Sequence, residues 1–157
     1  MILIDAHLDL SMNAINWDRD LTLGLHELRA REANMEQKRR ARGTTTYPEL
    51  RRGEVALSLA TVICRTTWPT STSSGVADQQ IAYGHAQGQL AYYRARERQG
   101  VLRQVRTQAD LQQHMAAWRA DADATPLGYI LSMEGADPIV DPDQVGAWWE
   151  DGLRVVS

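Results

Sequence analysis

This sequence has a single cysteine, no long apolar run and no excess of positive charge. Cys64 is the one cysteine, which excludes an intramolecular disulfide and favours a reducing compartment. No apolar run approaches the ~20 residues that a membrane span requires. Residues 1–10 contain two aspartates and no basic residue, unlike a secretory signal peptide. We therefore expect a cytoplasmic protein.

The charge of the chain argues against two classes of partner. A formal net charge of −3 at pH 7 predicts binding to neither nucleic acid nor a membrane surface. Basic residues do gather between Arg29 and Arg52, where they could form a phosphate-binding patch or the solvated face of a helix with its loop. The stretch lacks the interleaved aromatic residues of nucleic-acid platforms, which favours the solvated face.

What the sequence does contain is an alternation of short apolar runs and helical patterns. Its 157 residues, 43% of them hydrophobic, suit one soluble globular domain. The apolar runs predict buried strands at Ile2–Asp5, Val55–Ile63, Leu127–Met133 and Leu153–Val156. The helical patterns cover Leu23–Arg42, Thr46–Gly53, Val76–Gln99, Leu111–Ala120 and the segment from Asp141 to Gly152. This alternation predicts an α/β parallel sheet or barrel.

Several helix boundaries carry local signals. Pro48 lies in the first turn of its predicted helix, and Thr107-x-x-Asp110 resembles a capping box. Gly100 follows the longest helical pattern and is a typical terminator. One pattern stays open: the polar segment Arg65–Gly75 directly follows a strand, so it is either a catalytic-face loop of a barrel or a surface connector.

The first polar residues to suggest chemistry lie near the N-terminus. His7 and Asp9 follow an apolar strand as His-x-Asp, and alternate strand residues share a face about 6.6 Å apart along the backbone. Imidazole nitrogen and carboxylate oxygen are ligands of zinc and similar ions. The other interpretation is a strand end that carries two polar residues by chance.

A second strand end repeats this arrangement. The run Leu127–Met133 leads into Glu134, and Gly135 after it permits a tight turn. If the strands are parallel, Glu134 emerges at the same edge as His7 and Asp9. One histidine and two carboxylates there could be three ligands of one ion, or include a carboxylate that bridges two.

These motifs resemble the membrane dipeptidase (renal dipeptidase) family of zinc metallopeptidases. The resemblance rests on Asp5-Ala6-His7-Leu8-Asp9, on Ser132-Met133-Glu134-Gly135-Ala136 and on Gly152-Leu153-Arg154-Val155-Val156-Ser157, which occur in the family's order and span the whole chain. It implies a (β/α)8 TIM barrel of the metal-dependent hydrolase type, of which residues 1–157 resemble the first half. Four predicted strands cannot close an eight-stranded barrel, so the chain is either a small open α/β domain or, as we expect, part of a longer protein.

The resemblance also implies a site and a reaction. His7 and Asp9 would bind one zinc ion, and Glu134 would bridge two and be the catalytic carboxylate. A hydroxide between the two ions would attack the peptide bond of a dipeptide, with tolerance for D-amino acids at the C-terminal position. The family's other metal-binding histidines and its substrate-binding residues have no match in this chain.

Other residues are weaker candidates. His26, His85 and His114 lie in helical patterns and are expected to be solvent-facing or core residues, and Cys64 a structural thiol. Asp18, Asp20 and Asp137 are expected in loops, turns or caps, and at least one of Trp148 and Trp149 in the core.

Three functions therefore compete. The first is a dipeptidase, whose partner is a dipeptide substrate and for which a homodimer stays open. The second is a related amidohydrolase that acts on a non-peptide amide or lactone. The third is an inactive fragment that serves as a non-enzymatic module.

Overall fold

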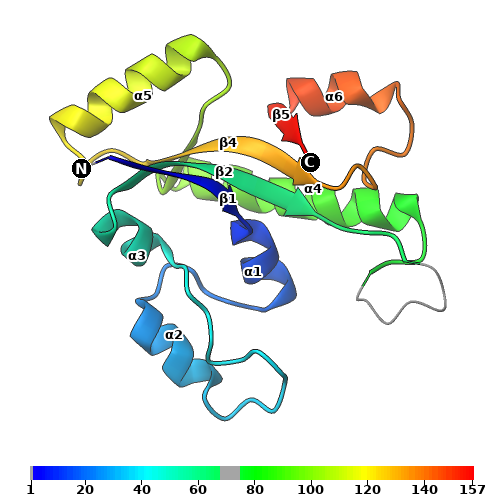
Figure 1. Ribbon diagram of the computed structural model, residues 1–157, viewed down its shortest axis with the longest axis horizontal. Coiled ribbons are helices and arrows are strands. Elements are labelled where there is room, and N and C mark those ends of the chain that lie inside the picture. The colour runs from blue at the N-terminus through cyan, green and yellow to red at the C-terminus, as the bar shows by residue number, and fades with distance from the viewer. Residues whose placement is uncertain (1, 68–74) are drawn as a thin grey trace.

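The computed structural model describes residues 2–67 and 75–157. Within them the chain alternates between strands and helices (Figure 1). In chain order the elements are β1 Leu3–Leu8, α1 Leu10–Asn16, α2 Leu25–Glu32, α3 Tyr47–Arg52, β2 Val55–Ile63, α4 Gln79–Arg98, β3 Leu102–Gln104, α5 Gln108–Ala120, β4 Leu127–Glu134, α6 Gln144–Glu150 and β5 Leu153–Val156. The expected loop Arg65–Gly75 lies partly outside the described residues.

The strands form one five-stranded parallel sheet. Its order is β1-β2-β4-β3, and β5 also pairs with β4. β3 lies beside the first half of β4, where Leu102 pairs with Leu127, and β5 lies beside the second half, where Leu131 pairs with Leu153. The predicted parallel pairing of the first two strands is confirmed.

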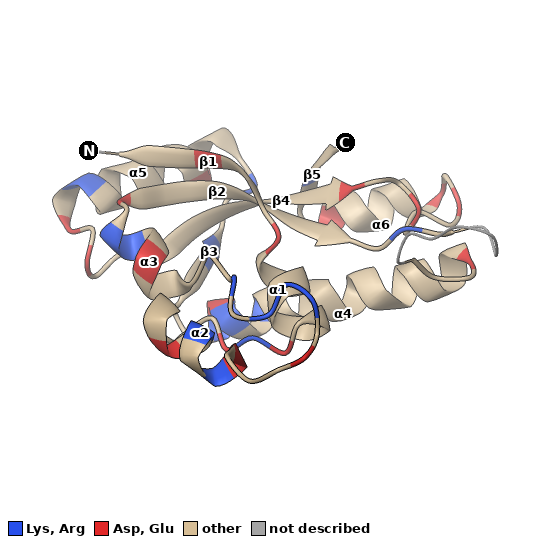
Figure 2. Ribbon diagram, turned by 60° about the horizontal axis from the view of Figure 1, so that its bottom comes forward, with Lys and Arg blue, Asp and Glu red and all other residues tan. Residues whose placement is uncertain are grey.

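One face of the sheet is covered by helices. α4 runs along the strands in both ribbon views (Figures 1 and 2), and α1, α3 and α4 all contact β2. Among the described residues no helix is long and apolar enough to cross a membrane.

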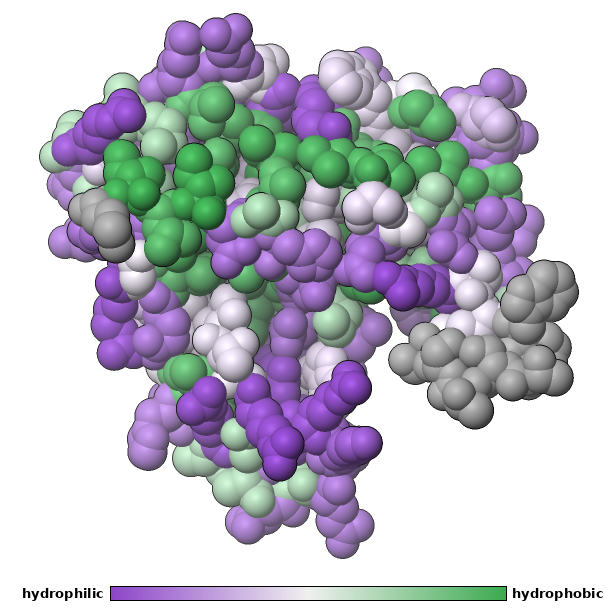
Figure 3. All heavy atoms as spheres, in the orientation of Figure 1, coloured by the Kyte–Doolittle hydropathy of each residue, from purple (hydrophilic) through white to green (hydrophobic). Residues whose placement is uncertain are grey.

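The opposite face of the sheet is partly open. Leu59 and Ile63 of β2 and Ile130 and Glu134 of β4 are the half-buried positions of these strands, and the register pairs Leu59 with Ile130 and Ile63 with Glu134. Since side chains alternate along a strand, these four residues share one face. Ile4 of β1 adds a 58% exposed side chain. Hydrophobic side chains form a band over the sheet in the space-filling view (Figure 3).

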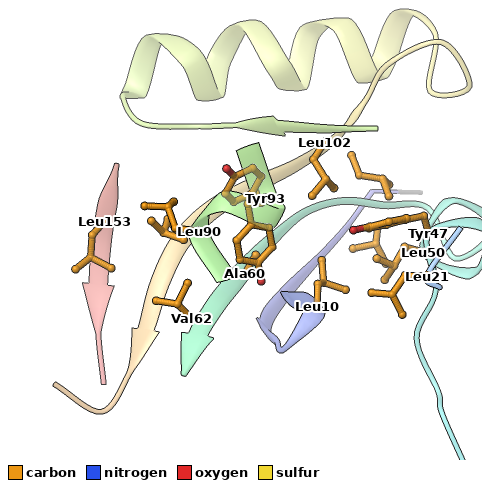
Figure 4. Close-up of a cluster of buried hydrophobic side chains, with 14 of the residues drawn as sticks. Leu10, Leu21, Tyr47, Leu50, Ala60, Val62, Leu90, Tyr93, Leu102 and Leu153 are labelled. Carbon is orange, nitrogen blue, oxygen red and sulfur yellow. The ribbon is translucent and has the colours of Figure 1, made fainter. Parts of the chain in front are cut away.

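The core lies between the covered face and α4. Tyr129, Leu131 and Met133 alternate with the half-buried positions of β4 and are fully buried. Leu90 and Tyr93 of α4 point into this cluster (Figure 4), and the ring of Tyr93 stacks on Tyr129 with centroids 5.1 Å apart. A fully buried Leu or Met side chain in this cluster contributes about 1.5–3 kcal/mol.

A buried amide ties α4 to the end of β2. The side chain of Gln89 donates to the Ile63 carbonyl over 2.7 Å and accepts from the Ile63 N–H over 2.9 Å. Tyr93 Oη donates to the Thr61 carbonyl over 2.8 Å. These bonds give partners to buried backbone groups, and they hold the end of β2 in place.

The predicted strands and helices form, but two of their ends are wrong. The first strand was expected to end at Asp5 and instead continues to Leu8, so that it includes His7. The capping box of Thr107 and Asp110 opens α5 as expected, and Gly100 takes a φ of 71° after α4. The helix predicted over Leu23–Arg42 instead ends at Glu32. The chain then turns back on itself, because the Glu32 carboxylate accepts a hydrogen bond from the Ala41 N–H over 2.7 Å. α1 and the short β3 had no counterpart in the predicted elements.

Candidate metal centre

Three predicted site residues meet at the carboxyl edge of the sheet. His7 is the penultimate residue of β1, and Asp9 follows that strand as the N-cap of α1. Glu134 is the last residue of β4. The Asp9 carboxylate makes no capping hydrogen bond to α1, so its oxygens remain available to other partners. Because β1 and β4 both run parallel to β2, their ends emerge together.

The three side chains are close enough to share a cation. His7 Nε2 lies 3.3 Å from Asp9 Oδ1 and 3.1 Å from Glu134 Oε2. One ligand atom of each residue lies within 4.8 Å of the others. The carboxylates are 24% and 22% exposed and the imidazole 49%, so the cluster is open to a small molecule.

Two neighbouring groups fix the orientation of the first motif. The buried Thr61 hydroxyl contacts both the Leu8 carbonyl, at 3.1 Å, and Asp9 Oδ1. Asp5 Oδ1 accepts from the His7 N–H over 2.9 Å. Such outer contacts orient metal ligands and are usually needed for full affinity.

The other oxygen of Glu134 faces a positive charge. The Arg65 guanidinium, just beyond the end of β2, forms an ion pair with Glu134 Oε1. Nearby, Asp137 Oδ1 accepts from the Thr66 N–H over 2.8 Å and from the Thr66 hydroxyl over 2.5 Å. These bonds connect the chain after β2 to the chain after β4 and lower the pKa of the Asp137 carboxyl.

The donor set fits one divalent ion. Ligands about 2.1 Å from zinc lie at most about 4.2 Å from each other, so the two separations from His7 already suit a shared ion. A small side-chain rotation would bring the third within range. One nitrogen and two carboxylate oxygens leave a fourth position open, as in catalytic zinc sites. Among the described residues no second histidine belongs to the cluster.

A pocket of about 840 Å³ opens beside Glu134, within the 300–1,000 Å³ typical of ligand pockets. Its wall comes from α1, from the loop after α2, from the chain on both sides of the undescribed segment and from His85 of α4. A substrate bound at the three-residue cluster would have room to extend into this pocket.

The weaker candidates lie where the sequence predicts. His26 and His85 are exposed, whereas His114 is fully buried and its Nε2 is 2.7 Å from the Ala56 carbonyl. Burial lowers the pKa of His114, so the neutral ring donates this bond. The ring packs against Gly128, where a Cβ would come within 2.4 Å of Nε2. His114 is therefore a core residue.

The remaining side chains also have structural roles. The Asp20 carboxylate accepts hydrogen bonds from the N–H and the hydroxyl of Thr22. Asp18 takes a φ of 50° in the loop after α1. Cys64 is half-buried, and burial raises the pKa of its thiol, which argues against a nucleophile. Trp148 is buried, and Trp149 is exposed beneath the Arg154 guanidinium.

Sequence reasoning missed Thr61, Asp5 and Arg65. Asp5 lies in the same opening motif as His7, and Arg65 follows a strand end as Glu134 does, so both carried a positional signal. Thr61 carried none, because a threonine within a β-strand is common and its contact with Asp9 depends on the pairing of β1 with β2.

The fold is shared with two solved dipeptidase structures. Dipeptidase AC, described as a metallopeptidase of family M19, matches with a TM-score of 0.63 and 19% identity over 100% of this chain and 42% of its own. The probable dipeptidase PvdM from Pseudomonas aeruginosa matches with a TM-score of 0.61 and 12% identity over 99% of this chain and 34% of its own.

These likenesses establish an α/β fold of the kind found in metallodipeptidases, and at the level of fold they confirm the resemblance inferred from the motifs. The chain spans less than half the length of either solved structure. No protein-family model matches it, and no curated protein sequence does.

Proposed function

We propose that residues 1–157 form the N-terminal portion of a TIM-barrel metallodipeptidase with a two-zinc site. The observation that carries the proposal is the cluster of His7, Asp9 and Glu134, with ligand atoms within 4.8 Å of one another. It lies at the carboxyl edge of a parallel sheet, where barrel enzymes place their active sites. Two solved structures with this fold are described as a dipeptidase and a probable dipeptidase.

The open face of the sheet supports the barrel. Leu59 and Ile130 share this face with Glu134, and in a closed barrel such apolar side chains fill the interior. Further strands would cover them and complete the ring.

Each residue of the cluster has a distinct task in this proposal. His7 and Asp9 would hold one zinc ion, and Glu134, whose two oxygens have different partners, would help to hold both. Thr61 keeps Asp9 in its orientation. Arg65 has a 58% exposed side chain, so it can leave Glu134 Oε1 when a second cation binds. Bound zinc supplies an acidified water and polarises the scissile carbonyl.

Metal content tests the site. The full-length protein is expected to hold about two divalent ions per chain, and the double variant His7→Ala with Glu134→Ala to lose them, as measured by plasma emission spectroscopy. His26→Ala with Glu36→Ala removes the same residue types from exposed positions and is the matched control. Unchanged metal content in the first variant contradicts the assignment.

Activity then separates the three functions. A dipeptidase cleaves dipeptides, whereas the related amidohydrolase cleaves only non-peptide amides or lactones with the same metals. A non-enzymatic module cleaves neither.

The proposal includes a cytoplasmic location, supported by the single Cys64, and assigns no role to nucleic acid or a membrane. Sedimentation of the intact protein decides between a monomer and a homodimer.

A further inference from the structure

Positive charge gathers around the pocket beside Glu134. Lys38, Arg39, Arg40 and Arg65 all line it, and Glu134 is the one acidic residue among the described lining residues. Arg65 is paired with Glu134. Among the described residues, the exposed side chains of Lys38 and Arg39 form no ion pair with an acid. Two cations therefore face the pocket without compensation.

The loop that carries these cations is held in place by a buried acid. The Glu32 carboxylate is 3% exposed and accepts hydrogen bonds from Arg19 and Arg40, over 2.8 and 3.1 Å, and from the Ala41 N–H. Arg40 also donates to the Trp17 carbonyl beside α1. Arg40 is thus an anchor, and the chain on either side of it cannot move freely away from the pocket.

The backbone bends at this anchor. Arg39 and Ala41 take φ values of 76° and 57°, a region in which residues other than glycine are strained. In Figure 2 a blue stretch marks the basic residues of the loop after α2, and the hydrogen bond from Arg40 to the Trp17 carbonyl holds this loop near the end of α1. The contacts that hold this bend present Lys38 and Arg39 at the pocket wall.

We propose that this pocket is an anion-binding subsite, in which Lys38 and Arg39, with Arg65 at its inner end, select dipeptides that carry an acidic side chain. The inference rests on the proposed dipeptidase function, which it refines by naming a substrate class. A dipeptide held at the cluster through its peptide group would direct one side chain along the pocket, where a carboxylate meets the two unpaired cations. Neutral side chains gain nothing from these charges.

Paired substrates test the selectivity in the full-length protein. Ala-Asp and Ala-Asn, and likewise Asp-Ala and Asn-Ala, have nearly the same shape and differ in charge. At low salt the acidic member of at least one pair is expected to be cleaved with a kcat/KM about 10-fold higher than its amide, since two exposed charge pairs together are worth roughly 1.4 kcal/mol. The preference should weaken as salt screens the charges.

The double variant Lys38→Gln with Arg39→Gln should bring this ratio close to 1. Arg98→Gln with Arg119→Gln removes two exposed charges outside the pocket and should retain the wild-type ratio. Equal cleavage of acid and amide by the wild-type protein, or a ratio that survives the first double variant, overturns the proposal.

Binding provides a readout that does not require hydrolysis. Glutarate, a small dicarboxylate, is titrated into the metal-free protein by calorimetry, and its Kd should rise about 10-fold in the Lys38/Arg39 variant only. If the Kd of glutarate rises in the Lys38/Arg39 variant but no dipeptide is cleaved, the dipeptidase function fails and the anion subsite stands. If dipeptides are cleaved without charge preference and glutarate binding ignores the variant, the subsite fails and the dipeptidase function stands.

Discussion

At the residue scale, the candidate centre depends on how each carboxylate is held. Glu134 has one oxygen 3.1 Å from His7 Nε2 and the other paired with Arg65. Asp9 is held instead by the Thr61 hydroxyl, which comes from a neighbouring strand. The candidate ligands are thus positioned by neighbouring side chains outside the three-residue cluster.

Replacing Thr61 by valine should weaken metal binding. The substitution keeps the side-chain shape but removes the hydroxyl that orients Asp9, and loss of such outer partners typically costs 10- to 100-fold in metal affinity. Competition with a chromogenic chelator measures the zinc Kd. Thr44→Val, at an exposed position, is the control, and equal affinities in the two variants would show that Thr61 does not orient the ligand.

At the element scale, the end of α2 decides the shape of the pocket wall. The helix stops at Glu32 because that side chain is occupied by Arg19, Arg40 and the Ala41 N–H, which draw the following chain back. The bond with Arg19 contributes most to lowering the pKa of Glu32, from its ordinary 4.5 to about 2. The stability of this ion pair and of the turn after α2 therefore depends on pH.

Glu32 should make the fold sensitive to acid. Because its folded-state pKa is depressed, the unfolded chain binds the proton more readily, and the stabilisation present above pH 4.5 is lost as pH falls toward 2. Urea unfolding should show a loss of about 2 kcal/mol between pH 6 and pH 3 from this group. Glu32→Gln should lack that component, whereas Glu36→Gln, at an exposed site, should keep it. Parallel pH profiles for wild type and Glu32→Gln would refute the linkage.

At the scale of the whole molecule, the sheet has one covered face and one partly open face. α4 covers the side of Tyr129 and Leu131, while Ile4 and Ile130 lie on incompletely covered strands. Parallel sheets are normally buried on both faces, and open strand edges favour association with other chains. The candidate metal centre lies at the carboxyl end of this partly covered side.

Residues 1–157 by themselves should hydrolyse no dipeptide at a useful rate. The described residues offer one histidine to the cluster, so a second ion would lack nitrogen ligands and could not acidify water reliably. The purified chain, shown by circular dichroism to be folded, is assayed with added zinc against L,L and L,D dipeptides. Turnover on the order of 10 per second, as in ordinary enzymes, would show that the site is complete as it stands.

Local sequence patterns were enough to predict much of the fold and the three residues that meet in the candidate centre. Val55–Ile63 and Leu153–Val156 match their strands at both ends, because continuous apolar runs have few alternatives to a buried strand. The Thr107–Asp110 capping box is a local hydrogen-bond motif and formed as predicted. Placing His7, Asp9 and Glu134 together needed one further assumption, parallel pairing, which strand–helix alternation supports.

The tertiary structure decided what distant residues do to one another. Arg65 reaches Glu134, and Gln89 binds both backbone groups of Ile63. Glu32 ends α2 through contacts with Arg19, Arg40 and the Ala41 N–H, which lie outside the helix. β3 forms because Leu102 can pair beside β4, although three residues are too few for a periodic pattern. Local propensity depends on neighbours in sequence, whereas these contacts depend on which strands lie side by side, so they emerge only when the sheet has formed.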